Sequence, residues 1–339
     1  MWGNLIPKTG PFFTSIGLNV LLFGKKVKSK KLVDEKVVQV MKLLKKISDR
    51  RKLKVDFAES KKYEKKAARL KTICLLVGPY RNLTTLTSSL AALHPQCQVL
   101  NHGYLRIEQV EQANFIKSFR PEKINTFAQF ATHISTSLEP GIQGGSITIS
   151  HAFSEHGKMR EIFGRRYADQ LLKNDMRCLL WKESNRITNA LQKYDFPFEE
   201  ALTSDKRLKF MMPIRHPMDC AKSNIKMKYA HFLVGREEAS FEEVLEAIVD
   251  QIAWFLDLKT EFPERFFSYF EHSLDESTLK SFAEFLGVEP EQRWMSDCLE
   301  VSELKPHYEY PDQQKALYQK LVNEKIARHE KARDALLKF

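Results

Sequence analysis

The sequence has little glycine, proline or cysteine, and it has no hydrophobic run long enough to cross a membrane. Its 339 residues include 13 glycines and 13 prolines, which excludes collagen-like repetition and a largely disordered chain. The five cysteines are scattered and lack metal-ligand spacing, which argues against a disulfide scaffold. We therefore expect an ordered chain in a reducing compartment, with buried free thiols at Cys74, Cys97, Cys178, Cys220 and Cys298.

One apolar run, PFFTSIGLNVLLFG at Pro11–Gly24, resembles neither a spanning helix nor a secretory signal. It has 14 residues, whereas a spanning helix needs roughly 20. A dense positive segment, KKVKSKK, follows this run, and no small-residue cleavage site appears. These features predict a cytoplasmic protein.

Positive charge is concentrated near the N-terminus. The whole chain has a net charge of +11, but residues 1–71 alone have 20 Lys and Arg against 6 Asp and Glu. The remaining chain is slightly acidic, so we expect no nucleic-acid partner, because a nucleic-acid-binding domain carries its own basic excess. Two interpretations of the basic segment stay open. It packs on the main domain with its lysines solvated, or it holds the protein peripherally on an anionic membrane surface.

Composition and periodicity predict three regions. Residues 1–70 form a basic arm with apolar positions at helical spacing, and 71–300 form an α/β domain. Residues 301–339 form a C-terminal helical extension, mostly one charged amphipathic helix over about 312–337.

Strands and helices alternate in the central region. TICLLV at Thr72–Val77 is a continuous β-prone run, as in a strand buried on both faces. A capping box at Ser240 and Glu243 predicts a helix start, and Gly287 predicts the end of another helix. The alternation predicts a mostly parallel sheet covered by helices on both sides. The other predicted strands are Gln98–Leu100, Ser146–Ile149, Cys178–Trp181, Leu208–Ile214 and Phe266–Phe270.

The segment from Val77 to Leu93 predicts an anion site. A buried strand leads through a turn into a helix, whose N-terminus presents free backbone N–H groups. Arg81 adds a cation, and Thr84 and Thr85 add hydroxyl donors. The segment departs from the ATP-binding P-loop, because Thr84 stands where that motif requires lysine. This departure argues against an ATPase or kinase.

A second segment, LKFMMPIRHPMDCAKS, also runs from a strand into a helix. Arg215 follows the strand, Pro217 suits the first helical turn, and Ser223 comes eight residues after the arginine.

Together the two segments resemble the sulfotransferase superfamily, which transfers sulfonate from 3′-phosphoadenosine-5′-phosphosulfate. The family's loop, [RK]-[ST]-G-[ST]-T-x-[LW], cradles the 5′-phosphosulfate, and its arginine and later serine hold the 3′-phosphate. A third segment at 267–287, a strand, an acidic turn and a helix ending in F-L-G, also matches. The resemblance covers about 71–290 and implies a P-loop NTPase-like three-layer fold. It implies donor contacts at Arg81, Asn82, Leu83, Thr84, Thr85, Leu86, Lys182, Arg215 and Ser223.

The loop departs from the family at two positions. Leu83 replaces the loop glycine, and Asn82 replaces the serine. Glycine adopts positive φ without steric cost, whereas leucine does not. Either the loop presents the same donors in another shape, or the donor site is altered and the protein is weak or inactive as an enzyme.

The resemblance also guides the choice of catalytic residues. Arg81 lies where the family places the cation that holds the leaving group, and His102 lies where several members place a base. Glu183, beside Lys182 in LLWKESN, is the second candidate base. An imidazole suits proton transfer near neutral pH, so His102 is preferred.

We therefore predict a sulfotransferase acting on a hydroxyl or amine of a carbohydrate, lipid or small molecule, with no metal required. Two alternatives remain: a nucleotide-dependent phosphotransferase, and a non-catalytic scaffold or membrane-surface protein on a degenerate sulfotransferase fold.

Overall fold

The computed structural model describes residues 52–138, 144–155, 157–168, 170–302 and 308–339. Leu53–Phe339 forms one compact unit. Most of the predicted basic arm, including the apolar run, lies outside the described residues, and its membrane contact stays a prediction. In the described part of the arm, residues 52–60 are helical, and η1 (Lys61–Tyr63) and α2 (Glu64–Ala67) follow.

The strands of the described ranges form one six-stranded sheet in the order β3-β2-β4-β1-β5-β6. Every neighbouring pair is parallel except β3 with β2, at one edge of the sheet. The predicted α/β class with a mostly parallel sheet between helices is confirmed. The strands are β1 (Thr72–Leu76), β2 (Cys97–Asn101), β3 (Gly145–Ser146), β4 (Cys178–Lys182), β5 (Leu208–Ile214) and β6 (Phe266–Phe270).

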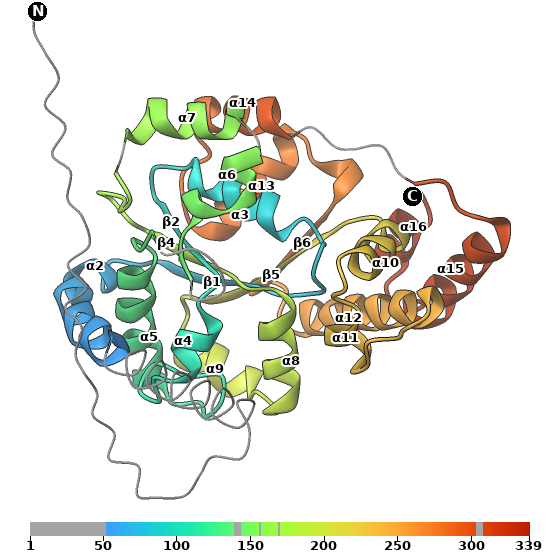
Figure 1. Ribbon diagram of the computed structural model, residues 1–339, viewed down its shortest axis with the longest axis horizontal. Helices are drawn as coiled ribbons and strands as arrows, with labels where there is room; N and C mark the ends of the chain where they lie inside the picture. The colour runs from blue at the N-terminus through green and yellow to red at the C-terminus, as the bar shows by residue number, and fades with distance from the viewer. Residues whose placement is uncertain (1–51, 139–143, 156, 169, 303–307) are drawn as a thin grey trace, which may run out of the picture. The chain divides into compact units, whose positions relative to one another are not determined.

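Helices cover both faces of the sheet (Figure 1). On one face lie α3 (Thr84–Ala92), α6 (His151–Glu155), α7 (Gly157–Tyr167), α13 (Glu276–Leu286) and α14 (Gln292–Val301). On the other lie α4 (Tyr104–Glu108), α5 (Pro121–Ile134), α8 (Asn185–Lys193), α9 (Phe198–Ser204) and α12 (Phe241–Glu261). The chain also has α10 (Pro217–Lys226), α11 (His231–Val234), α15 (Asp312–Lys325) and α16 (Glu330–Leu336).

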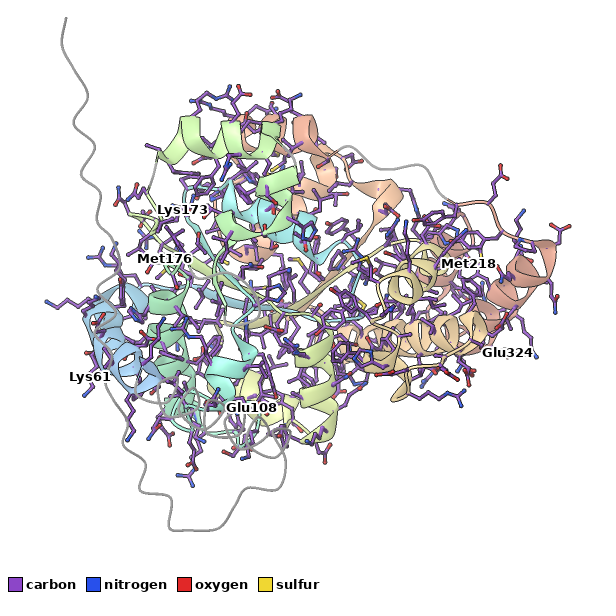
Figure 2. The ribbon with its side chains drawn as sticks, viewed as in Figure 1. Lys61, Glu108, Lys173, Met176, Met218 and Glu324 are labelled. Carbon is purple, nitrogen blue, oxygen red and sulfur yellow. The ribbon has the colours of Figure 1, made fainter. Side chains whose placement is uncertain are left out.

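The core has one apolar layer on each side of the sheet. Ile73 and Leu75 of β1 pack into one layer, and Cys74 and Leu76 pack into the other. Alternate side chains of a strand point to opposite faces, so a strand buried on both faces is apolar throughout. Side chains fill the space between the sheet and the helices on both sides (Figure 2). All five cysteines are free and buried, as predicted.

Helix boundaries follow the expected signals at α12 and α13. Ser240 and Glu243 form the complete capping box at the start of α12. Gly287 adopts φ of 71° directly after α13. A glycine takes this left-handed conformation without the steric cost that a side chain would add.

Two predicted elements were wrong in extent. The strand expected at Ser146–Ile149 shrinks to β3 and a short 3-10 helix, η3 (Ile147–Ile149), because the Ser146 hydroxyl accepts a hydrogen bond from the Thr148 N–H. The single C-terminal helix is instead α15 and α16. The Tyr318 hydroxyl donates to the Leu336 carbonyl at 2.7 Å, a contact that a continuous helix would hold about 27 Å apart.

None of the helices in the described part of the chain is both long and apolar enough to cross a membrane.

The loop between β1 and α3 determines the shape of the site. Leu83 adopts the left-handed conformation, with φ of 59° and ψ of 3°, directly before α3. Its carbonyl then accepts hydrogen bonds from the N–H and the hydroxyl of Thr87. The leucine therefore takes the backbone conformation for which the sequence pattern expects glycine. For a residue with a side chain this conformation costs roughly 1–2 kcal/mol.

We expect Leu83→Gly to be more stable than Leu83→Ala by about 1 kcal/mol, because only glycine escapes the steric cost of positive φ. At Leu86, inside α3, the order should reverse, since alanine is the better helix former by about 1 kcal/mol. Urea unfolding of the four variants tests both statements. If the glycine and alanine variants have the same order of stability at both positions, the result would contradict the left-handed turn at Leu83.

Candidate functional site

A cleft of about 580 Å³ opens at the carboxyl ends of the central strands. In a parallel α/β sheet, ligands bind at this edge. Cationic and hydroxyl-bearing side chains line one part of the cleft, and apolar side chains line another. The lining residues are Tyr80, Arg81, Thr84, Thr85, His102, His151, Lys182, Ser184, Arg186, Met227, Tyr229 and Phe232.

Strand order brings these residues together. Strands β2, β4 and β1 are neighbours, and Asn101 and Leu76 flank Lys182 in register. His102 follows β2 directly, and the loop before α3 follows β1. Segments that are far apart in the sequence therefore reach one cleft.

The two predicted anion-binding segments meet through direct contacts. The Arg81 Nε donates to the Ser223 Oγ at 3.0 Å. The Asn82 Oδ1 accepts from the backbone N–H of Arg215 at 2.8 Å, and Asn82 is buried. The loop after β1 is therefore tied to the second segment at two points, Arg215 and Ser223. Asn82 connects segments in the interior and does not line the cleft.

Lys182 lies beside His102 in the cleft. Its Nζ is 3.3 Å from the His102 Nε2. Burial lowers the pKa of Lys182 to about 8, with Glu183 acting to raise it and Arg81 acting to lower it. A lysine that titrates near neutral pH can hold an anion or give up a proton.

Glu183 lies beneath the cleft and does not line it. Its side chain is fully buried, and it accepts from the Tyr104 N–H and from Arg186, each at 3.1 Å. The Glu183 Oε1 also lies 3.8 Å from the His102 Nδ1, while the His102 side chain is 29% exposed. The two candidate bases are therefore neighbours, and only His102 reaches the cleft.

Arg215 lies outside the lining of this cleft. Its guanidinium is 3.7 Å from the Asp219 carboxylate and 3.8 Å from the Glu271 carboxylate. Both carboxylates are buried, and Asp219 also accepts from the Tyr310 hydroxyl at 2.7 Å. The structure connects Ser223 to Arg81 and places Arg215 between two acids.

Several residues around the cleft have positive φ although they are not glycine. Arg81, Leu83, His102 and Ser184 have φ values of 65°, 59°, 61° and 54°. Each such conformation costs of order 1–3 kcal/mol, and such strain gathers at functional sites. Each of the three central strands therefore leads into a strained turn at the cleft.

The predicted site residues separate into two groups. Arg81, Thr84, Thr85, His102 and Lys182 line the cleft. The others support the cleft from outside. Asn82 and Glu183 are buried, Leu86 packs on the core, and Leu83 directly precedes α3. Arg215 and Ser223 are hydrogen-bonded to Asn82 and Arg81 of the loop after β1.

Sequence reasoning missed part of the lining. Arg186 comes three residues after Glu183, and this helical spacing could have indicated the ion pair. The other missed residues are Tyr80 and Ser184, which are next to Arg81 and Glu183 in the sequence, His151 at the start of α6, and Met227, Tyr229 and Phe232. The last three carry no local signal, because the packing of α10 and α11 brings them to the cleft.

In the described ranges no three His, Cys, Asp or Glu side chains gather as a metal site. The cleft instead presents cationic side chains and a helix N-terminus, which together suit a phosphate or sulfate group.

Among solved structures, the chain is similar to a sulfotransferase domain from the olefin synthase of Synechococcus PCC 7002. The match has 15% identity and a TM-score of 0.33, and it covers 74% of this chain and 86% of that chain. No family model and no curated protein matches the sequence. A match at this level assigns neither a family nor an activity, and the function is inferred from the residues of the site.

Proposed function

We propose that the protein transfers a sulfonate group from 3′-phosphoadenosine-5′-phosphosulfate to an acceptor hydroxyl or amine. The donor, when bound, supplies the activated sulfonate. The observation that carries the proposal is the position of Arg81, which lines the cleft and hydrogen-bonds Ser223 of the second segment. One side chain thereby joins both parts of the sulfotransferase-like pattern.

The 5′ end of the donor fits the cationic part of the cleft. Backbone N–H groups at the start of α3, with the hydroxyls of Thr84 and Thr85, suit phosphate oxygens. Arg81 and Lys182 supply positive charge where negative charge grows on the leaving phosphate. This arrangement needs no lysine at position 84, which supports sulfonate transfer over phosphoryl transfer.

His102 is the base in this proposal. The Lys182 Nζ lies 3.3 Å from the His102 Nε2. When Lys182 turns to an anionic donor, that nitrogen is left to accept the acceptor's proton. The Glu183 carboxylate near the Nδ1 stabilises the imidazolium that forms. Glu183 is thus a positioning residue.

Arg215 is proposed to recognise the 3′-phosphate together with Ser223. The buried partners Asp219 and Glu271 lie 3.7 and 3.8 Å from the guanidinium and hold it in place. The left-handed Leu83 supports a working loop over a degenerate one, because the turn keeps the conformation that glycine would give.

Calorimetry with adenosine 3′,5′-bisphosphate and 5′-AMP tests the two arginines separately. We expect Arg81→Ala to weaken both nucleotides alike, since both have a 5′-phosphate. Arg215→Ala should weaken only the bisphosphate, by roughly ten- to a hundredfold, the value of a charge-assisted hydrogen bond.

The ratio of the two affinities within one variant is independent of partial unfolding. An unchanged ratio in Arg215→Ala would remove this residue from the 3′-phosphate site. Tighter binding of ATP than of the bisphosphate would favour a phosphotransferase.

Bisphosphate affinity should fall as pH rises above the pKa of Lys182, which is about 8 in the free cleft. A bound anion raises the pKa of Lys182. Bisphosphate affinity is therefore highest at pH values below the pKa of the free protein, and it falls until the pH exceeds the raised pKa of the complex. Lys182→Arg keeps its charge and should abolish this decline. Calorimetry across this pH range compares the parent protein with Lys182→Arg. A decline in bisphosphate affinity of the same size in Lys182→Arg would exclude Lys182 as the cause of the decline.

A further inference from the structure

The C-terminal extension packs against the turn that carries Arg215. Its described part, 308–339, ends beside α10 (Figure 1). The ring of Phe339, the last residue, lies 5.0 Å from the His216 ring, and the Tyr318 ring lies 5.6 Å from the His216 ring, centroid to centroid. His216 directly follows Arg215, and its side chain caps α10. Packing at the end of the chain therefore reaches the second segment.

The extension also contacts a carboxylate beside Arg215. The Tyr310 hydroxyl donates to the Asp219 Oδ1 at 2.7 Å, and the Tyr308 N–H donates to the same oxygen at 3.3 Å. The other oxygen of this carboxylate, Oδ2, lies 3.7 Å from the Arg215 guanidinium. Asp219 and Tyr310 are both buried. One side of the carboxylate thus faces the extension, and the other faces the arginine.

Arg215 lies near two carboxylates without a close ion pair to either. A charge-assisted N–H···O hydrogen bond is about 2.7–2.9 Å long, whereas Arg215 is 3.7 Å from Asp219 and 3.8 Å from Glu271. The Arg215 Nε is buried and has no hydrogen-bond partner among the residues that the structure describes. A buried donor in this state costs free energy until a ligand satisfies it. Arg215 can therefore turn to an anion without first breaking a close pair.

The Tyr310 hydroxyl is a fixed donor that can maintain this spacing. Its ring lies 6.0 Å from the His216 ring and 5.9 Å from the Phe241 ring, centroid to centroid. Burial and the neighbouring Asp219 carboxylate raise the pKa of Tyr310, so the hydroxyl keeps its proton. A buried carboxylate that loses one donor needs another, and the Arg215 guanidinium is a strong one. Loss of the Tyr310 hydroxyl would therefore draw Asp219 and Arg215 together.

We propose that Tyr310 is a positioning residue for recognition of the 3′-phosphate, because its hydroxyl holds Asp219 and leaves Arg215 open to the phosphate. This inference rests on the proposed function, in which Arg215 and Ser223 bind the 3′-phosphate of the donor. Tyr310 acts on the nucleotide only through Asp219 and Arg215. The C-terminal extension thereby helps to select a nucleotide with a 3′-phosphate over one without it.

Calorimetry on the full chain measures the ratio of the affinity for adenosine 3′,5′-bisphosphate to the affinity for 5′-AMP. We expect Tyr310→Phe to lower this ratio roughly tenfold, because a closed pair of Arg215 and Asp219 must open before the 3′-phosphate binds. Tyr318→Phe is the matched control, since it also removes a buried hydroxyl that donates at 2.7 Å, but to the Leu336 carbonyl. Its ratio should equal that of the parent protein. An unchanged ratio in Tyr310→Phe, or an equal fall in Tyr318→Phe, would overturn the inference.

A second comparison tests the route through Asp219. In Asp219→Asn the carboxylate that could close on Arg215 is gone, so adding Tyr310→Phe should change the ratio by less than about twofold. A fall as large as in the parent background would show that Tyr310 acts by another route, and the inference would be wrong. A parent protein that binds the bisphosphate and 5′-AMP equally tightly would instead overturn the proposed 3′-phosphate site itself, so the two failures are distinguishable.

Discussion

The parallel pairing of β2, β4 and β1 is the constraint on which the site depends. Parallel strands in register end at the same edge, so the residues that follow them must lie close together. Lys182 ends β4 between two neighbouring strands, and it is buried there. The lowered pKa of Lys182 and its contact with His102 follow from this position.

The hydrogen bonds around the loop after β1 join this edge to the rest of the molecule. Gly78 N–H donates to Thr188 of α8 at 2.7 Å, and Asn82 accepts from Arg215 after β5. The loop therefore rests on the elements on both of its sides, which holds Leu83 in an unfavourable conformation. Such an arrangement holds Arg81 at the cleft. Preorganised cations of this kind stabilise developing charge without reorganising at the moment of reaction.

The sequence predicts the sheet well, because apolar runs such as Thr72–Leu76 can be satisfied only by burial on both faces. It predicts less of the C-terminal region, since periodicity does not show that α16 turns back on α15. Motif spacing finds Arg81, Thr84, Thr85 and Lys182, which lie at the ends or starts of regular elements or in the loop between them. It cannot find Tyr229 or Phe232, because their position in the cleft depends on the packing of α10 and α11 against the loop after β1.

The central claim is that the cationic part of the cleft binds the 5′-phosphate end of an adenine nucleotide. A crystal structure of the full chain with adenosine 3′,5′-bisphosphate tests this claim most directly. The proposal predicts the 5′-phosphate at the N-terminus of α3, within hydrogen-bonding distance of Arg81 and Lys182, and the 3′-phosphate near Arg215 and Ser223. A nucleotide bound away from this edge of the sheet, or bound with its phosphates against Tyr229 and Phe232, would contradict it.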